Sequence, residues 1–390
     1  MQIIPAKRMN HFGEGIFQML NDKKREVEAS GKKVYNFSVG TPDFPPANHI
    51  MEAVAKACEK PENYKYALAD LPQLTEAVIK RYETRYHVTG LQPEEIMCVY
   101  GSQEGIAHIG LSLINEGDVV LIPDPGYPIF DVGPALAGAE LVTYELKEEN
   151  DYLPDLDLLE KQWGNKAKLM IVSYPLNPIC KIAPPSFYER LIPWAKKNNI
   201  IIVHDNAYSD IIYDGNEGRS FLSFEGAKEV GVEFYSLSKS FNYTGARVSF
   251  VVGNKEIVQS FKKLRSQIDY GIFLPIQYGA IAALTGPDTC VIEQCAEYEK
   301  RRNALCDGLT NIGWTMERSQ GTMFAWTKIP SKYSDDVEFV MDLLEKTGVL
   351  CTPGSSFGKL GCGHVRFALT MPVSKIEEAI AKIKESKILE

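Results

Sequence analysis

Two ionisable residues stand where the sequence predicts that buried strands end. Asp205 lies in the run NIIIVHDN (199–206), and Lys239 directly follows the run EFYSLS (233–238). A carboxylate or ammonium at such a place loses hydration, so it must be paired, neutralised or bonded to a ligand. Arg247 follows Lys239 within the stretch SLSKSFNYTGAR. These charged groups predict a ligand site at the ends of the strands.

The elements that must position these residues alternate along the chain. Runs typical of strands cover 95–102, 118–123, 140–146, 168–175, 199–206, 233–238 and 247–254. Amphipathic segments of helical length lie between most of them, and this alternation predicts an α/β fold with a mostly parallel sheet flanked by helices. Near residue 288 the pattern changes to helices mixed with short strands. We predict a large domain over 45–285 and a smaller α+β domain formed by 286–390 and 1–44.

Each predicted strand is followed by a group that could contact a ligand. In open α/β sheets, ligands bind beyond the carboxyl ends of the strands. The strand ends lead into GSQEG, PDPGYP, PLNP, DNAYSD and the lysine. Taken singly, Ser102 is explained as a helix cap, Tyr127 as a loop filler and Asn177 as a turn residue. Their joint order and spacing favour one shared ligand.

Pyridoxal 5′-phosphate is a ligand that uses all of these groups. It forms a Schiff base with a lysine, and it needs an acid beside its pyridine nitrogen. Its phosphate suits a helix N-terminus and an arginine. Asp205, Lys239, Arg247 and the Gly-Ser turn at 101–102 supply these features.

With these motifs, the chain resembles the aspartate aminotransferase superfamily, fold type I, of pyridoxal-phosphate enzymes. The resemblance runs from NFSVGTPDFPP (36–46) to VRFALT (365–370), and it combines NP, HDNAY and SLSKSFNYTGAR in that order. It implies an aminotransferase that acts by a ping-pong mechanism on an α-amino acid and a 2-oxo acid. It also implies a homodimer with shared active sites.

The resemblance implies a role for each residue that matches a motif. Lys239 would bind the cofactor aldehyde and carry the proton between Cα and C4′, and Asp205 would hold the pyridine nitrogen protonated. Tyr208 and Asn177 would bind the phenolic oxygen of the ring, while Tyr127 would stack on its face.

The phosphate and the substrate have their own implied partners. The resemblance implies that the phosphate is bound by Ser102, Gln103, Ser236, Ser238 and Arg247. Tyr66, in NYKYALADLPQL, would reach the phosphate of the neighbouring subunit. Arg366 would bind the substrate α-carboxylate as a bidentate pair, and Gly40 would close over it.

Within the superfamily, the chain is most similar to the branch of LL-diaminopimelate and alanine-type aminotransferases, but it departs from that branch near the expected pocket. The departures are Leu176, Ile179 and Cys180 in LNPIC for NNPTG, Ala246 for tryptophan, Ser249 and Asp70 for glycines, and Gln103 for the lysine of GSKEG. A tyrosine near the start of that branch is either replaced by Gly15 or absent. They alter the pocket that selects the substrate and remove no catalytic group. LL-diaminopimelate, alanine, glutamate and aspartate all remain open as substrates.

Composition and charge narrow the class of protein. The net charge of −9 argues against nucleic acid or an anionic membrane as a partner. The absence of a long apolar stretch or a signal-like start predicts a cytoplasmic protein. The eight cysteines form no CxxC pair and the six histidines no HExxH motif, which predicts free thiols and no metal site.

Two other functions fit parts of the sequence. A carbon–sulfur β-lyase of the cystathionine type would use the same cofactor and expel a β-thiol. A catalytically silent regulator would keep the cofactor domain and add a DNA-binding region before it. The motif GTPDF already stands at residues 40–44 and leaves no room for a winged helix, and the chain is acidic.

Overall fold

The structure is a computed structural model that describes residues 1, 3–12 and 16–390. Gly15 and its predicted departure lie outside the described residues. The strands are β1 (Tyr35–Asn36), β2 (Ile96–Val99), β3 (Val119–Asp124), β4 (Glu140–Glu145), β5 (Ala167–Ser173), β6 (Ile201–Asn206), β7 (Gly231–Ser236), β8 (Ser249–Gly253), β9 (Phe324–Lys328), β10 (Val349–Leu350), β11 (Thr352–Pro353) and β12 (His364–Ala368). The α-helices are α1 (Ile16–Ala29), α2 (Asn48–Cys58), α3 (Pro72–Tyr86), α4 (Ser102–Leu113), α5 (Ile129–Ala137), α6 (Leu156–Trp163), α7 (Pro185–Asn198), α8 (Ala227–Val230), α9 (Leu237–Ser240), α10 (Lys255–Arg265), α11 (Leu274–Thr285), α12 (Thr289–Asn311), α13 (Asp336–Thr347) and α14 (Val373–Ser386).

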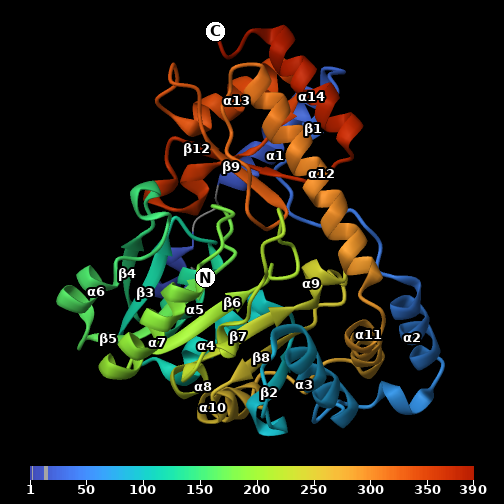
Figure 1. The fold of residues 1–390 in the computed structure, drawn as a ribbon, viewed down its shortest axis with the longest axis vertical. Helices are drawn as coiled ribbons and strands as arrows, with labels where there is room; N and C mark the ends of the chain where they lie inside the picture. The colour runs from blue at the N-terminus through green and yellow to red at the C-terminus, as the bar shows by residue number, and fades with distance from the viewer. Residues whose placement is uncertain (2, 13–15) are drawn as a thin grey trace.

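A seven-stranded sheet forms the centre of the larger part, in the order β2-β8-β7-β6-β5-β3-β4. The strands from β7 to β4 are parallel, whereas β8 runs antiparallel to both of its neighbours. Helices α4, α5 and α10 pack against the strands, and helices surround the sheet (Figure 1). Strands covered on both faces are expected to be apolar throughout, and every residue of β3 and β7 is buried. This confirms the predicted α/β fold.

A smaller set of elements lies at one end of the molecule. β9, β11 and β12 form an antiparallel sheet, and β1 pairs with β10 in parallel. Figure 1 shows the orange and red C-terminal elements gathered with the blue α1 and β1. One hydrophobic core extends along the chain from Ile50 to Val291, and a second combines Leu20 to Phe37 with Tyr298 to Ile388 and takes in Cys180, Tyr208, Ile211 and Tyr213. The predicted domain boundaries stay a prediction, because these last four residues belong to the predicted large domain but pack with the smaller part.

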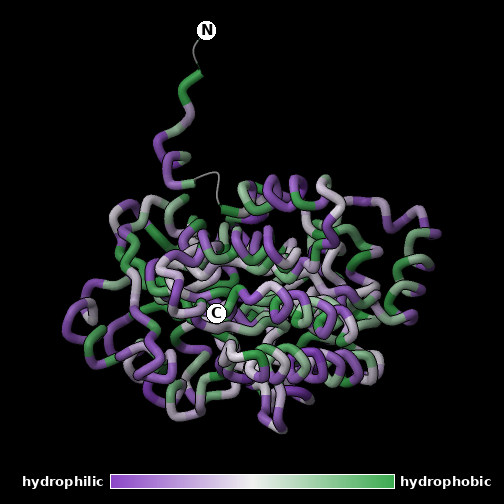
Figure 2. The backbone as a smooth tube through the Cα atoms, turned by 90° about the horizontal axis from the view of Figure 1, so that it is seen from above, coloured by the Kyte–Doolittle hydropathy of each residue, from purple (hydrophilic) through white to green (hydrophobic). Residues whose placement is uncertain are grey.

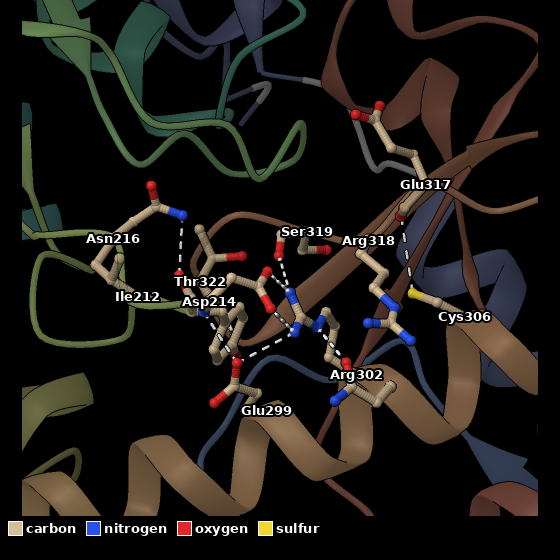
Figure 3. Close-up of polar contacts among 12 residues, drawn as sticks. Ile212, Asp214, Asn216, Glu299, Arg302, Cys306, Glu317, Arg318, Ser319 and Thr322 are labelled. Atoms are coloured by element: carbon tan, nitrogen blue, oxygen red, sulfur yellow. Dashed lines mark hydrogen bonds and ion pairs between the residues drawn. The ribbon is translucent and has the colours of Figure 1, made fainter.

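Arg302 joins α12 to the segment that follows β6 (Figure 3). Its guanidinium is fully buried and donates to both carboxylate oxygens of Asp214, at 2.6 and 2.9 Å, and to the backbone oxygen of Ser319, at 2.8 Å. The neighbouring residue Tyr213 packs its ring against the same guanidinium, 4.8 Å from the ring centroid. Because Tyr208 lies on this segment, the clamp helps to fix one wall of the functional site.

The strand predicted at 233–238 ends two residues earlier than expected, at Ser236. The side chain of Ser236 accepts a hydrogen bond from the backbone nitrogen of Ser238 and caps the short helix α9. Lys239 therefore lies in a helical turn that follows the strand.

The start of the chain contacts the larger part at α5. Figure 2 shows residues 3–12 leading away from the body of the molecule. His11, in the 3-10 helix η1 (Lys7–His11), lies 3.2 Å from Asp131 on α5. Among the described residues, no helix is long and apolar enough to span a membrane.

Candidate active site

The carboxyl ends of β5, β6 and β7 open into a pocket of about 550 Å³. A volume of this size is typical of sites for small molecules. The predicted residues that line the pocket are Gly40, Ser102, Gln103, Tyr127, Asn177, Asp205, Tyr208, Ser236, Ser238, Lys239, Arg247 and Arg366. The structure brings together every predicted site residue except Tyr66.

Lys239 has a polar contact but no carboxylate partner. Its Nζ donates to the backbone oxygen of Gly40 at 2.7 Å. Burial, together with the nearby charges of Arg366 and Arg247, lowers the pKa of Lys239 to about 8. A substantial fraction of this amine is thus neutral near physiological pH, which is the form that acts as a nucleophile.

Asp205 is a buried carboxylate at the end of β6. Its side chain is 7% exposed, and its Oδ1 has no hydrogen-bond partner within the described residues. Burial and the negative charge of Glu233 raise the pKa of Asp205 to about 7. A ligand that brings a positive N–H group to this oxygen would stabilise the ionised form.

Arg366 lies on β12 between two aromatic rings. Its guanidinium carbon is 4.1 Å from the ring centroid of Phe324 and 4.6 Å from that of Phe357. It donates to Asn177 Oδ1 at 2.8 Å and to the backbone oxygen of Ser38 at 3.2 Å. Burial lowers the pKa of Arg366 to about 10. This is a buried guanidinium without a carboxylate, the arrangement that recognises a carboxylate ligand.

The other end of the pocket combines a helix start with Arg247. A Cβ atom added to Gly101 would lie 2.2 Å from Nη2 of Arg247, so the glycine lets the guanidinium approach the start of α4 closely. Gly101 also has a φ of 86°, which favours glycine. Ser102 Oγ is buried without a partner in the described part of the chain. Free donors at a helix N-terminus, beside an arginine, fit an anion.

Three further predicted residues surround the space between these ends. Tyr208 and Asn177 are buried, at 7% and 5% exposure, and Tyr127 is partly buried. Burial raises the pKa values of Tyr127 and Tyr208, so both phenols stay protonated and can donate. The side chains of this middle region are therefore neutral and able to form hydrogen bonds.

Several residues of the site were not predicted from the sequence. Gln294, on α12, donates from its side chain to the backbone oxygen of Lys239 at 2.7 Å and so helps to position α9. Thr352, on β11, lies 3.4 Å from Arg366 Nη2, and Phe324 and Phe357 enclose the same guanidinium. These contacts join segments far apart in the chain, and no local motif marks them.

Tyr66 lies outside the pocket. It is 78% exposed, and its ring centroid is 5.1 Å from that of Tyr270, which is itself 59% exposed. Tyr64, Leu68, Ile268 and Phe273 are further exposed hydrophobic residues of the same two segments. An exposed patch of this kind is typical of an interface with another protein.

Two of the sequence departures have clear local consequences. Cys180, for the family's glycine, is buried with a φ of 67°, a region that favours glycine. Asp70, also for a glycine, accepts a hydrogen bond from the backbone nitrogen of Cys98 at 2.9 Å.

Comparisons with known proteins identify the family of this chain. The family model "Aminotransferase class I and II" matches residues 32–383. The LL-diaminopimelate aminotransferase of Halothermothrix orenii is 40% identical over 384 residues, with 98% of each chain covered. That of Aquifex aeolicus is also 40% identical, with 96% of each chain covered.

Solved structures give the same result. Substrate-bound BacF from Bacillus subtilis superposes with a TM-score of 0.94 at 34% identity, covering 99% of this chain and 98% of BacF. A probable N-succinyldiaminopimelate aminotransferase from Thermus thermophilus has a TM-score of 0.90 at 32% identity, covering 95% of this chain and all of that one.

The chain belongs to the aminotransferase class I and II family, whose members generally depend on pyridoxal phosphate. It is an aminotransferase, an enzyme that acts on amino and 2-oxo acids. This confirms the family and the reaction class predicted from the sequence.

Proposed function

We propose that this aminotransferase binds pyridoxal 5′-phosphate in the pocket at the ends of β5, β6 and β7 and moves an amino group from an α-amino acid to a 2-oxo acid by a ping-pong mechanism. The observation that carries the proposal is the set of Lys239, Asp205 and Arg366. Among the described residues, each is an ionisable group without a partner of opposite charge, and all three line one pocket. Perturbed groups gathered in a cleft are typical of active sites.

The residues present fit this cofactor. Asp205 Oδ1 is free to accept from a protonated ring nitrogen, and Ser102 Oγ is free to bind a phosphate oxygen. The space between Arg247 and the glycine before α4 has no room for a side chain. When bound, the cofactor supplies an aldehyde for the amino group and a pyridine ring that draws electrons from the Cα–H bond.

Lys239 would hold the aldehyde and then move a proton. Its lowered pKa leaves a larger fraction of the amine neutral than in an ordinary lysine, so it can attack a carbonyl carbon and, once released, accept a proton from the substrate Cα. Asp205 would hold a proton at the pyridine nitrogen by charge and by hydrogen bonding. Tyr208 and Asn177 would bind the phenolic oxygen, and Tyr127 would pack on the ring.

The phosphate would lie at the start of α4. We assign it to Ser102, Gln103, Ser236, Ser238 and Arg247, with Tyr66 of the partner subunit reaching it across a homodimer interface. The exposure of Tyr66 in the single chain supports this assignment, because a tyrosine with no contact to its own pocket is free to enter another.

Arg366 would bind the α-carboxylate that amino and 2-oxo acids share. Its two aromatic neighbours exclude water and hold the guanidinium plane, which strengthens a bidentate contact. Gly40 would close over the substrate, since its backbone oxygen already accepts from Lys239 and a Cβ there would lie 2.6 Å from the ring of Phe324.

Borohydride reduction tests the role of Lys239. With added pyridoxal phosphate, reduction should fix one cofactor per chain, on the peptide that contains Lys239. Lys239→Ala should abolish both the fixation and turnover. Lys228→Ala, a lysine paired with Glu95 and outside the pocket, is the matched control and should retain both. Fixation on another lysine, or turnover by Lys239→Ala, would refute the proposal.

A mixed dimer tests the shared site. Tyr66→Ala should weaken cofactor binding in a dimer of identical chains. When Lys239→Ala and Tyr66→Ala chains are combined, one site of each mixed dimer regains both residues, so activity should return. A monomer in sedimentation, or no recovery of activity in the mixture, would contradict the proposed dimer interface.

The cytoplasmic location rests on the sequence and stays a prediction.

A further inference from the structure

The pocket holds only as many cations as the proposed cofactor and one α-carboxylate require. Among the described residues that line it, the basic side chains are Lys239, Arg247 and Arg366. If the proposed function is right, Lys239 binds the aldehyde, Arg247 the phosphate and Arg366 the α-carboxylate. Among the described residues that line the pocket, no further basic side chain remains to bind a second carboxylate of the substrate.

Apart from these cations and Asp205, the wall is apolar or uncharged. Its large hydrophobic residues come from α1, from the segment after β1, from α4, α5 and β9, and from the 3-10 helix η6 (Gly354–Phe357). They are Leu20, Val39, Ile106, Ile129, Phe130, Val132, Phe324 and Phe357. Asn21 and Thr41 add neutral polar groups. Gln103 is also neutral.

This wall discriminates between substrate side chains. An apolar side chain gains stability as it leaves water for such a surface. A second carboxylate would lose hydration without gaining a cation, which is strongly unfavourable in a buried site. The same pocket serves both half-reactions of a ping-pong enzyme, so donor and acceptor meet the same selection.

We infer that the substrates are α-amino acids with uncharged, mainly apolar side chains, and that the acceptors are the corresponding neutral 2-oxo acids, with pyruvate as the smallest. Glutamate, aspartate, 2-oxoglutarate and LL-diaminopimelate are poor substrates, since each carries a second ionised carboxylate. The inference rests on the proposed function and narrows its substrate class.

Single-turnover spectroscopy of the cofactor-loaded dimer tests this selection. Methionine and glutamate are a matched pair, because their side chains have similar length. The rate per unit concentration should favour methionine by at least about 100-fold, as expected when a buried group is left without its partner. If glutamate or LL-diaminopimelate reacts as fast as methionine, the inference is wrong. A cation supplied to the pocket by the partner subunit would produce this result. If no donor reacts at all, the proposed function fails instead.

Equilibrium binding gives a readout that does not depend on turnover. Calorimetry on the loaded dimer should show tighter binding of 4-methylpentanoate than of glutarate, two unreactive acids of similar length. Equal or tighter binding of glutarate contradicts the inference even if catalysis is slow.

A variant with an added cation sharpens the test. Val39 lines the pocket and is 49% exposed, so a longer side chain there can extend without entering the core. Val39→Arg should raise the glutamate-to-methionine rate ratio about 5- to 10-fold, the gain expected for a partly exposed ion pair. Val39→Gln, similar in length but neutral, should not raise it. An unchanged rate ratio in Val39→Arg would contradict the inference that this wall of the pocket contacts the side chain of the substrate.

Discussion

Two buried carboxylates, five positions apart on the same segment, have opposite environments. Asp210 accepts from Arg85 Nε at 3.0 Å and from the hydroxyl of Tyr235 at 3.0 Å, with Arg81 at 3.5 Å. Burial alone would raise its pKa, but the two guanidinium groups lower it. Asp205 has no such partners, and its pKa is raised to about 7. Partners within the chain mark Asp210 as structural, and their absence among the described residues supports the proposal that Asp205 contacts a ligand.

The difference extends to the cations of the two regions. Arg81 and Arg85 near Asp210, and Arg302 in its clamp, have carboxylates within the chain. Lys239 and Arg366 in the pocket have only neutral oxygens as partners. A folded chain tolerates such unpaired groups at a cost in stability, which a ligand of the right charges removes.

The largest effect should come from removing the paired carboxylate. Asp210→Ala leaves Arg85 and the Tyr235 hydroxyl without their buried acceptor, so the free energy of unfolding should fall by about 3–5 kcal/mol. Denaturant titration of the cofactor-free protein measures this change. Asp157→Ala removes an exposed carboxylate and should leave the transition in place. Equal stability of the two variants would show that Asp210 is not a structural anchor.

The unpaired carboxylate should behave in the opposite way. Asp205→Asn should lower kcat about 10²- to 10³-fold, because it removes the charge that holds a proton on the ring nitrogen. Its unfolding should be unchanged or shifted to higher temperature in the cofactor-free protein. Asp131→Asn, outside the pocket on α5, is the control and should retain full activity. Near-normal kcat in Asp205→Asn would remove this residue from the mechanism.

The raised pKa of Asp205 also predicts how stability depends on pH. The folded state holds this proton up to about pH 7, whereas the unfolded state loses it near pH 4. The proton therefore stabilises the fold at pH 5, and that contribution is lost as the pH rises through 7. Relative to Asp205→Asn, the cofactor-free wild type should lose about 2–3 kcal/mol between pH 5 and pH 8. Parallel stability curves for the two proteins would be inconsistent with a raised pKa.

The types of chemical group in the pocket could be predicted from the sequence, because they depend on which residues come at the end of each strand. A buried strand that ends with Asp205 and Asn206, and another followed by the turn with Lys239, place both groups at one edge of a parallel sheet. The same reasoning cannot separate Asp205 from Asp210, which comes shortly after the same strand. Arg85, which distinguishes them, is 125 positions away in the sequence.

The surroundings of Arg366 could not be predicted for a related reason. Phe324, Phe357 and Asn177 meet the guanidinium only after the smaller sheet has packed over the larger one. The helical turn that carries Lys239 was also missed, because its cap is a single serine at the end of an apolar run. Packing between distant segments determines these features, and periodicity along the chain does not record it.

The smallest effect should come from an ion pair on the surface near the Arg302 clamp. Arg318 binds both carboxylate oxygens of Asp307, at 2.9 and 2.7 Å, but both side chains are about half exposed. Water and salt replace most of what such a pair contributes, so Arg318→Met should change Tm by less than about 2 °C. Arg302→Met removes a fully buried guanidinium and leaves the buried backbone oxygen of Ser319 without a donor, so it should lower Tm by clearly more (Figure 3). Differential scanning calorimetry of the two variants measures both shifts. Equal shifts would show that burial does not set the value of a paired charge in this protein, and the contrast between Asp205 and Asp210 would then need another cause.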